Sequence, residues 1–201
     1  MQLRDAILQV EEIRLHLART ERFRGFRSSP VVLSAGMAFA AASVQPIIIP
    51  NPMQAIAAYV LLWMGVAAIS LAAAAAVMYH RSTQPNLGLL RETNRLAIEQ
   101  FVPCLAAGGL ATAALFGAAP DHAALLPGMW AMFLSLGIFA CWRLMPKPMF
   151  VVAVYYLFSG ALVLLRGHGE QALSPWTMAA TFGVGQSLAA GVLYFSMERD
   201  P

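Results

Sequence analysis

The sequence predicts an all-α polytopic membrane protein with six transmembrane helices, and three observations carry that prediction. Apolar residues make up 59% of the 201 residues and charged residues only 11%, with a mean hydropathy of +0.65, whereas a soluble domain carries about 25% charged residues. The apolar residues form six runs of roughly membrane-spanning length, and the basic residues gather in connections on one side of those runs. A chain of this size exposes too much surface to hide so many apolar side chains in a water-soluble core. The composition therefore argues against a soluble enzyme and against a domain that binds nucleic acid directly.

Residues 1–29 are predicted to form a cytoplasmic amphipathic helix ahead of the membrane domain. Their apolar side chains recur at helical spacing and would share one face, which contains Leu3, Ile7, Val10, Ile13 and Leu17. The rest of this segment mixes four acidic with six basic residues over positions 4–27. Such a helix either lies in the headgroup region of a bilayer or docks on a protein partner, and the mixed charge favours the protein partner. The segment has no uninterrupted apolar stretch of the kind found in a cleaved signal peptide.

Residues 30–198 are predicted to form one transmembrane domain. The first span begins at Ser28-Ser29-Pro30, where a hydroxyl cap and an early proline suit a helix start. Asn51-Pro52, Leu126-Pro127 and Ser174-Pro175 mark the starts of the even-numbered spans in a similar way. The third helix is expected to begin before its apolar run, because apolar residues already recur at helical spacing ahead of it. The six spans cover about residues 31–49, 55–79, 101–118, 125–145, 149–165 and 177–195.

The basic residues are sorted between the two sides of the predicted spans. Twelve of the thirteen fall before span one, between spans two and three, between spans four and five, or after span six. Arg166 alone lies in a connection on the other side. The positive-inside rule therefore places both termini in the cytoplasm.

Internal similarity predicts that the spans pair as three helical hairpins. Residues 22–36 resemble residues 95–109 at an offset of 73, and the even-numbered spans share their proline starts. Small residues also recur at every fourth position in spans six and three, namely Gly183, Ser187 and Gly191, and Gly109, Ala113 and Gly117. In lipid this pattern lets helix backbones approach closely. We expect these residues to pack helices within one protomer, with a self-associating face as the alternative.

The spans contain no ionisable side chain near the middle of the predicted bilayer. Such residues usually mark transport or proton relay, so their absence from the sequence pattern argues against a proton-coupled transporter, a pump or an intramembrane protease. Gln186 is central in span six and needs a polar partner, which Tyr155, Tyr156 or Ser159 in span five could supply. An interhelical hydrogen bond is the expected role, and a ligand contact by these four residues is the alternative.

The predicted external loops carry two histidines and two carboxylates. Asp121, His122, His168 and Glu170 are residue types that bind divalent cations such as zinc. Nothing in their spacing forces them together, so a metal site there is a minor hypothesis. No nucleotide-binding loop, nucleophile elbow or HExxH motif is present, and we expect no cofactor.

Three stretches resemble an uncharacterised family of small bacterial six-span membrane proteins. They are residues 97–103 (AIEQFVP), residues 126–140 with their LPGMW start, and residues 172–186 (from ALSPW to FGVGQ). The resemblance covers most of the chain from Arg19 on and implies a multi-pass protein of the bacterial inner membrane. Members of that family are thought to be encoded beside a small winged-helix regulator, which implies a regulatory or scaffold role.

Three function hypotheses follow. The first is a non-enzymatic inner-membrane scaffold, accessory subunit or regulatory partner, which contacts the lipid bilayer and a protein partner or a second copy of itself. The second is a small-molecule transporter or substrate-binding membrane subunit with a pocket among spans five and six. The third and weakest is a membrane enzyme that uses the external histidine and carboxylate residues.

Overall fold

The structure, a computed structural model, describes residues 28–82, 88–166 and 169–197. All regular elements in these ranges are helical, and no strand occurs among them. In chain order they are α2 (Ser28–Ile48), α3 (Ile56–Ser82), α4 (Gly88–Ala118), η1 (Pro120–Leu125), α5 (Leu126–Cys141), η2 (Trp142–Leu144), α6 (Met149–Arg166), η3 (Gly169–Gln171), α7 (Pro175–Met178), η4 (Ala179–Gly183) and α8 (Val184–Met197). The predicted amphipathic helix of residues 1–29, except for its last two residues, lies outside the described part.

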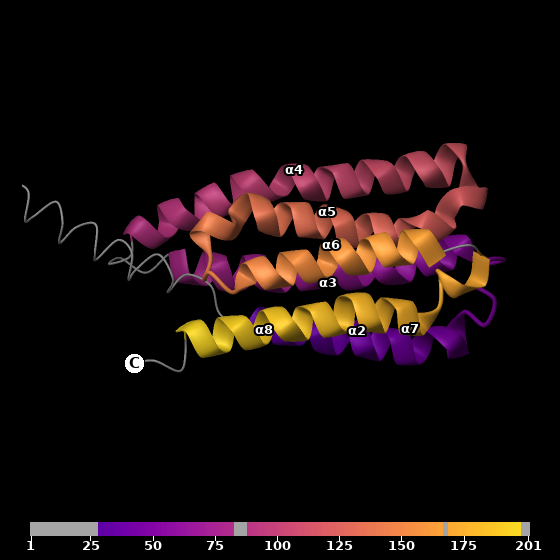
Figure 1. The fold of residues 1–201 in the computed structure, drawn as a ribbon, viewed down its shortest axis with the longest axis horizontal. Helices are drawn as coiled ribbons and strands as arrows, with labels where there is room; N and C mark the ends of the chain where they lie inside the picture. The colour runs from indigo at the N-terminus through magenta and orange to yellow at the C-terminus, as the bar shows by residue number, and fades with distance from the viewer. Residues whose placement is uncertain (1–27, 83–87, 167–168, 198–201) are drawn as a thin grey trace, which may run out of the picture.

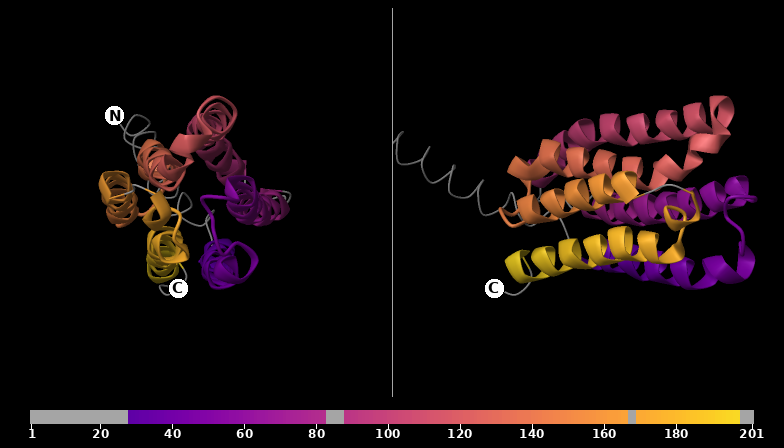
Figure 2. Two further views of the ribbon diagram at one scale, coloured as in Figure 1. Left: turned by 90° about the vertical axis from the view of Figure 1, so that its right-hand side faces the viewer. Right: turned by 45° about the vertical axis from the view of Figure 1, so that its right-hand side comes forward.

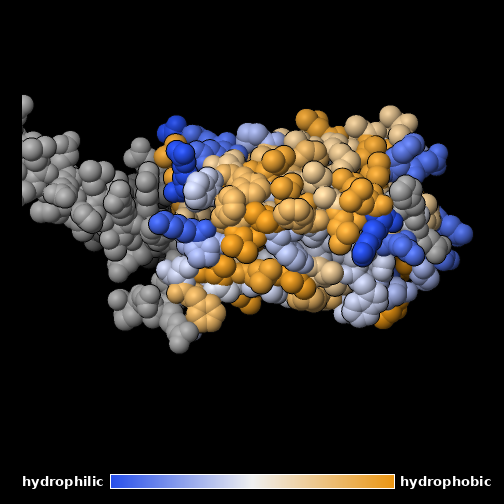
Figure 3. All heavy atoms as spheres, in the orientation of Figure 1, coloured by the Kyte–Doolittle hydropathy of each residue, from blue (hydrophilic) through white to orange (hydrophobic). Residues whose placement is uncertain are grey.

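Six of the described helical stretches are long and apolar enough to cross a membrane, and this confirms the predicted spans. They cover Ser28–Ile48, Ile56–His80, Arg95–Ala118, Pro120–Leu144, Met149–Arg166 and Pro175–Ser196. Figure 3 shows the matching surface, on which a hydrophobic band separates two hydrophilic ends. The fold is therefore that of a multi-pass α-helical membrane protein.

The two similar lead-ins of the sequence occupy different places in their helices. Pro30 lies in the first turn of α2 as the structure describes it, a position at which proline is tolerated. Pro103 lies inside α4, which begins at Gly88 and continues through the proline to Ala118. The expected early start of the third helix is thus correct. The sequence similarity, however, does not mark two equivalent helix starts.

The six long helical stretches form a ring that follows the order of the chain. The left view of Figure 2 looks down the axis of this ring, in which α8 lies beside α2 and closes the ring. Helix α5 contacts α4 and α6 extensively, and α2 contacts α3 and the α7–η4–α8 stretch extensively. The contacts between α3 and α4 and between α6 and α8 are sparse. The bundle therefore consists of two three-helix groups joined along two weaker seams.

Chain direction gives the bundle two distinct ends (Figure 1). Helix α2 begins and α8 ends at one end, which we call the near end. The connection at residues 49–55, η1 and η3 lie at the other end, which we call the far end.

One cluster of buried side chains joins α2, α3, η1 and the residues before α7, and includes Tyr59, Trp63 and Leu173. A second joins α5, α6 and α8 around Val152, Tyr156 and Leu193.

Glycines allow the closest helix approaches. Helices α5 and α6 meet at Gly128 and Gly160, where a Cβ atom on Gly160 would lie 2.8 Å from the carbonyl oxygen of Gly128. Aromatic rings fill the space beside other glycines: Phe101 lies against Gly137, and Phe39 lies against Gly183. In a lipid environment this close packing holds helices together, because lipid supplies no hydrophobic driving force between them.

Candidate ligand groove between α6 and η4

A buried amide ties three parts of the far end together. Gln45 in α2 is 1% exposed. Its Oε1 accepts a hydrogen bond from Trp63 Nε1 of α3 at 3.0 Å, and its Nε2 donates to the carbonyl oxygen of Leu173 at 2.8 Å. The amide thus fixes the segment before α7 to the first two helices. Gln45 is not among the residues predicted from the sequence, although it is the one amide in the first apolar run.

A similar bond joins the next pair of helices. Trp130 of α5 donates through Nε1 to Thr112 Oγ1 of α4 at 2.8 Å, and the threonine hydroxyl in turn donates to the carbonyl oxygen of Gly108. The tryptophan lies 18 residues after its acceptor in both pairs. Both tryptophans therefore act as polar links between consecutive helices as well as packing residues.

The last membrane-spanning stretch contains one turn of π-helix, and that turn contacts α6. Residues Ala179–Gly183 form η4 between α7 and α8. The wider π-turn changes the backbone hydrogen-bond register and is often found at functional sites. The Tyr155 hydroxyl of α6 donates a hydrogen bond to the carbonyl oxygen of Ala180 in this turn. This bond links α6 to η4 across one of the sparse seams.

A groove of about 610 Å³ lies beside this contact. One face of α6 forms its first wall, because the lining positions on α6 recur at intervals of three and four residues: Tyr155, Phe158, Ser159, Leu162, Val163 and Arg166. The second wall comes from η3, α7 and η4 and the residues between them: Gln171, Ala172, Trp176, Thr177, Ala180 and Thr181. We call this space the α6–η4 groove.

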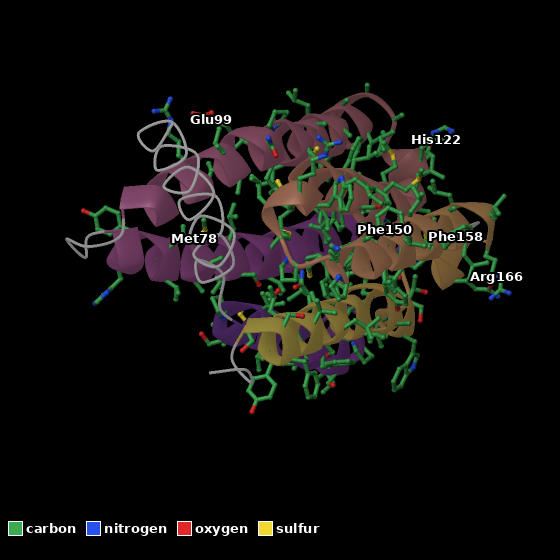
Figure 4. All side chains as sticks on the ribbon, turned by 60° about the vertical axis from the view of Figure 1, so that its left-hand side comes forward. Met78, Glu99, His122, Phe150, Phe158 and Arg166 are labelled. Carbon is green, nitrogen blue, oxygen red and sulfur yellow. The ribbon has the colours of Figure 1, made fainter. Side chains whose placement is uncertain are left out.

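The α6–η4 groove is apolar along its length and polar at its far end. Phe158 and Trp176 are 69% and 80% exposed, so the groove opens on the side of the bundle that lipid would cover. Figure 4 shows Phe158 on α6 between Phe150 and Arg166, and Arg166 at the far end, where His122 also lies. Within the described residues, neither the Arg166 guanidinium nor the Gln171 amide has a hydrogen-bond or ion-pair partner. Both groups lie at the mouth of the groove.

Two of the four residues predicted to bind a ligand line this groove. Tyr155 lies at the end of the groove away from Arg166. Ser159 also lines the groove, and the Ser159 hydroxyl donates a hydrogen bond to the carbonyl oxygen of Tyr156 at 3.2 Å. Tyr156 turns to the other side of α6, where its ring fills the space beside Gly185 of α8 and its hydroxyl is buried without a partner among the described residues. Gln186 is half-buried, is not among the lining residues, and forms no hydrogen bond within the described ranges.

The predicted metal ligands are only partly described. Asp121 and His122 are exposed in η1 at the far end. His168 and the side chain of Glu170 lie outside the described part. Among the residues that the structure does describe, no three histidine, cysteine, aspartate or glutamate side chains come together as a metal site would require.

The predicted packing stripes differ in what they contact. Gly183 packs against Phe39 of α2, and the Ser187 hydroxyl donates to the Gly183 carbonyl oxygen at 2.8 Å. The positions beside Gly191, Gly109 and Gly117 have no neighbouring atom within 4 Å, and Ala113 is exposed. The stripe on α4 therefore faces away from the other described helices. The predicted partner-binding residues Leu3, Ile7, Val10, Ile13 and Leu17 lie outside the described part.

Comparisons with protein-family models, with curated proteins and with solved structures gave no match. The class of the protein therefore comes from its own fold, which is a six-helix membrane bundle.

Proposed function

We propose that this chain is a non-enzymatic membrane protein that binds a small amphipathic molecule in the α6–η4 groove. The observation that carries the proposal is the groove itself, with an apolar face of α6 on one side and a π-turn on the other. Its volume of about 610 Å³ lies within the roughly 300–1,000 Å³ that ligand pockets occupy. Mostly apolar walls with a few polar groups at one end are also typical of such pockets.

The proposal is tested by identifying what the purified protein retains. The wild type and two variants are extracted in mild detergent, and the small molecules released on denaturation are identified by mass spectrometry. Ser159→Trp fills the groove, whereas Leu188→Trp places the same introduced side chain at an exposed position of α8 outside it. We expect a molecule near one equivalent with the wild type and Leu188→Trp, and its loss from Ser159→Trp. Equal retention by all three proteins, or no retained molecule, would contradict the proposal.

We further propose that the spans act as three hairpins in the bacterial inner membrane, with both termini cytoplasmic. One side-chain bond links each consecutive pair: Trp63 with Gln45, Trp130 with Thr112, and Tyr155 with Ala180. The basic residues of the sequence support the orientation. In this orientation the mouth of the groove faces the outer side of the membrane.

The scaffold role remains a second candidate, because one surface of the bundle is unusually open. Only 11% of the apolar stretch of α3 and 6% of that of α4 are buried, against 50% for Pro120–Leu144. The stripe of Gly109, Ala113 and Gly117 lies on this open surface. A second copy or a partner helix would gain close backbone contact there.

Cross-linking tests this second candidate. Ala113→Cys is introduced into a variant with Cys104→Ala and Cys141→Ala, and Leu162→Cys in the groove serves as the control. We expect oxidation to give a disulfide-linked dimer, or a mixed disulfide with a partner, only for Ala113→Cys. Equal cross-linking at both positions would indicate random collision in the membrane.

A further inference from the structure

The α6–η4 groove has the length of one membrane leaflet. Its lining on α6 runs from Tyr155 to Arg166, which at 1.5 Å per helical residue is about 16 Å. The hydrocarbon core of a bilayer is about 30 Å thick, so one leaflet contributes about 15 Å. Since α6 begins at Met149 and ends at Arg166, the groove occupies the far two thirds of the helix. An acyl chain that lies in the groove would run parallel to the lipids of that leaflet.

The chemistry of the groove changes along this length in the order that a lipid requires. Between its ends the α6 wall presents Phe158, Leu162 and Val163, which suit an acyl chain. At the far end Arg166 and Gln171 offer hydrogen-bond donors without a partner among the described residues. A guanidinium binds phosphate oxygens through two parallel hydrogen bonds. Trp176 lies at the same end, as tryptophans at a membrane interface do.

The charge of the described side chains at the mouth favours an anionic headgroup over a zwitterionic one. Arg166 is the only charged residue among the described side chains that line the groove, and none of them is acidic. An ethanolamine or choline group would therefore meet a cation and find no carboxylate among those side chains. The exposed positions of Phe158 and Trp176 leave the groove open toward the bilayer, so a lipid can enter sideways.

We propose that the α6–η4 groove binds one anionic phospholipid of the surrounding leaflet. One acyl chain lies between α6 and η4, and the phosphate is bound by Arg166 with Gln171 beside it. This assignment rests on the proposed binding function and names its ligand class. In this assignment Arg166, the one basic residue in a connection on the outer side, binds the phosphate of the lipid headgroup.

Native mass spectrometry of the purified protein tests the proposal. The protein is equilibrated in detergent with equal amounts of phosphatidylglycerol and phosphatidylethanolamine that carry the same chains. We expect the wild type to retain one phosphatidylglycerol in preference, and Arg166→Gln to lose about tenfold of that preference, the effect of one charge-assisted hydrogen bond. Arg166→Lys should keep part of the preference because the charge remains. Arg143→Gln, which removes the same charge at the near end, should keep all of it.

The outcomes separate this inference from the proposed function. Equal retention of the two lipids by the wild type, or an unchanged preference in Arg166→Gln, overturns the assignment of an anionic phospholipid. If Ser159→Trp at the same time loses some other molecule, the binding function stands and only the ligand class is wrong. If neither lipid is retained and Ser159→Trp behaves as the wild type does, both are wrong. Unchanged helix content and elution volume of Arg166→Gln show that it is folded.

Discussion

Three side chains, Gln45, Trp63 and Tyr155, form hydrogen bonds that connect parts of the bundle across the apolar interior. Within a membrane an unsatisfied polar group finds no water, so its partner in the protein matters more than on a soluble surface. Of the three side chains, the buried Gln45 depends most on its partners, because its amide both donates a hydrogen bond through Nε2 and accepts one through Oε1. Its loss leaves a donor on α3 and an acceptor before α7 unpaired.

Replacement of this amide should therefore weaken the whole far end. We expect Gln45→Leu to lower the free energy of unfolding by about 1–3 kcal/mol, the cost of leaving a buried polar partner unsatisfied. Reversible unfolding in mixed micelles measures this difference. Ser43→Ala is the matched control, because the Ser43 hydroxyl is exposed and donates only to the Phe39 carbonyl oxygen of its own helix. A Gln45→Leu protein as stable as Ser43→Ala would show that the amide bonds contribute nothing.

At the scale of elements, glycines decide which helices touch and which do not. Gly128 and Gly160 bring the backbones of α5 and α6 together, whereas Gly109 and Gly117 on α4 have no neighbour within 4 Å. The same residue type in two similar patterns thus has two different structural roles. Sequence spacing alone does not distinguish them, because it does not specify which face of a helix meets a neighbour.

Adding one methyl group separates these roles. A Cβ atom on Gly160 would meet the backbone of Gly128, so Gly160→Ala must push α5 and α6 apart, and we expect a loss of about 1–3 kcal/mol in unfolding free energy. Gly109→Ala adds the same atom in open space, so it should leave the stability of the monomer unchanged or raise it by up to about 1 kcal/mol, because alanine favours a helix more than glycine does. Unfolding of the two purified variants under identical conditions measures the contrast. Equal stabilities would contradict the close approach of α5 and α6.

The π-turn η4 is hydrogen-bonded to the neighbouring helix α6. Tyr155→Phe removes the hydroxyl that bonds to the Ala180 carbonyl oxygen. We expect amide hydrogen exchange across Ala179–Gly183 to become about fivefold faster, since an interhelical hydrogen bond in a membrane protein is worth about 1 kcal/mol. Tyr194→Phe, at an exposed tyrosine of α8, controls for loss of a hydroxyl. Unchanged exchange in Tyr155→Phe would show that α6 does not stabilise the turn.

At the scale of the whole molecule, the ring consists of two well-packed groups, with α4, α5 and α6 in one and α3, α2 and α7–α8 in the other (Figure 2). The α6–η4 groove lies along the seam between α6 and the last membrane-spanning stretch. A sparse seam is a reasonable place for a ligand, because few direct helix contacts must be broken to admit it.

Labelling of introduced cysteines tests the proposed orientation of this ring. In the cysteine-free background, Asp121→Cys lies at the far end and Lys147→Cys at the near end, and both positions are exposed. We expect a membrane-impermeant maleimide to label Asp121→Cys in intact cells and Lys147→Cys only after permeabilisation, because the basic connections stay in the cytoplasm. The opposite pattern would place the mouth of the groove on the cytoplasmic side.

The spans could be predicted from the sequence because hydropathy and length are local properties of each run. Tyr155 and Ser159 could be proposed for a binding site because polar groups stand out inside an apolar helix. Three features could not be predicted: the second wall of the groove, the π-turn, and the pairing of Gln45 with Leu173. Each depends on which helix faces meet across the ring. Arg166, in turn, is prominent in the sequence only as the exception to the charge pattern.

The bond from Gln45 to Leu173 links the first helix to the second wall of the groove, which begins only two residues earlier at Gln171. Gln45 in turn accepts the indole proton of Trp63, whose ring is buried in α3. A molecule that spreads the walls is therefore expected to alter the hydrogen bonding of Trp63, which lies outside the groove. We therefore expect the fluorescence of Trp63 to report occupancy of the groove without an added label, in a protein whose other tryptophans, Trp130, Trp142 and Trp176, are replaced by phenylalanine.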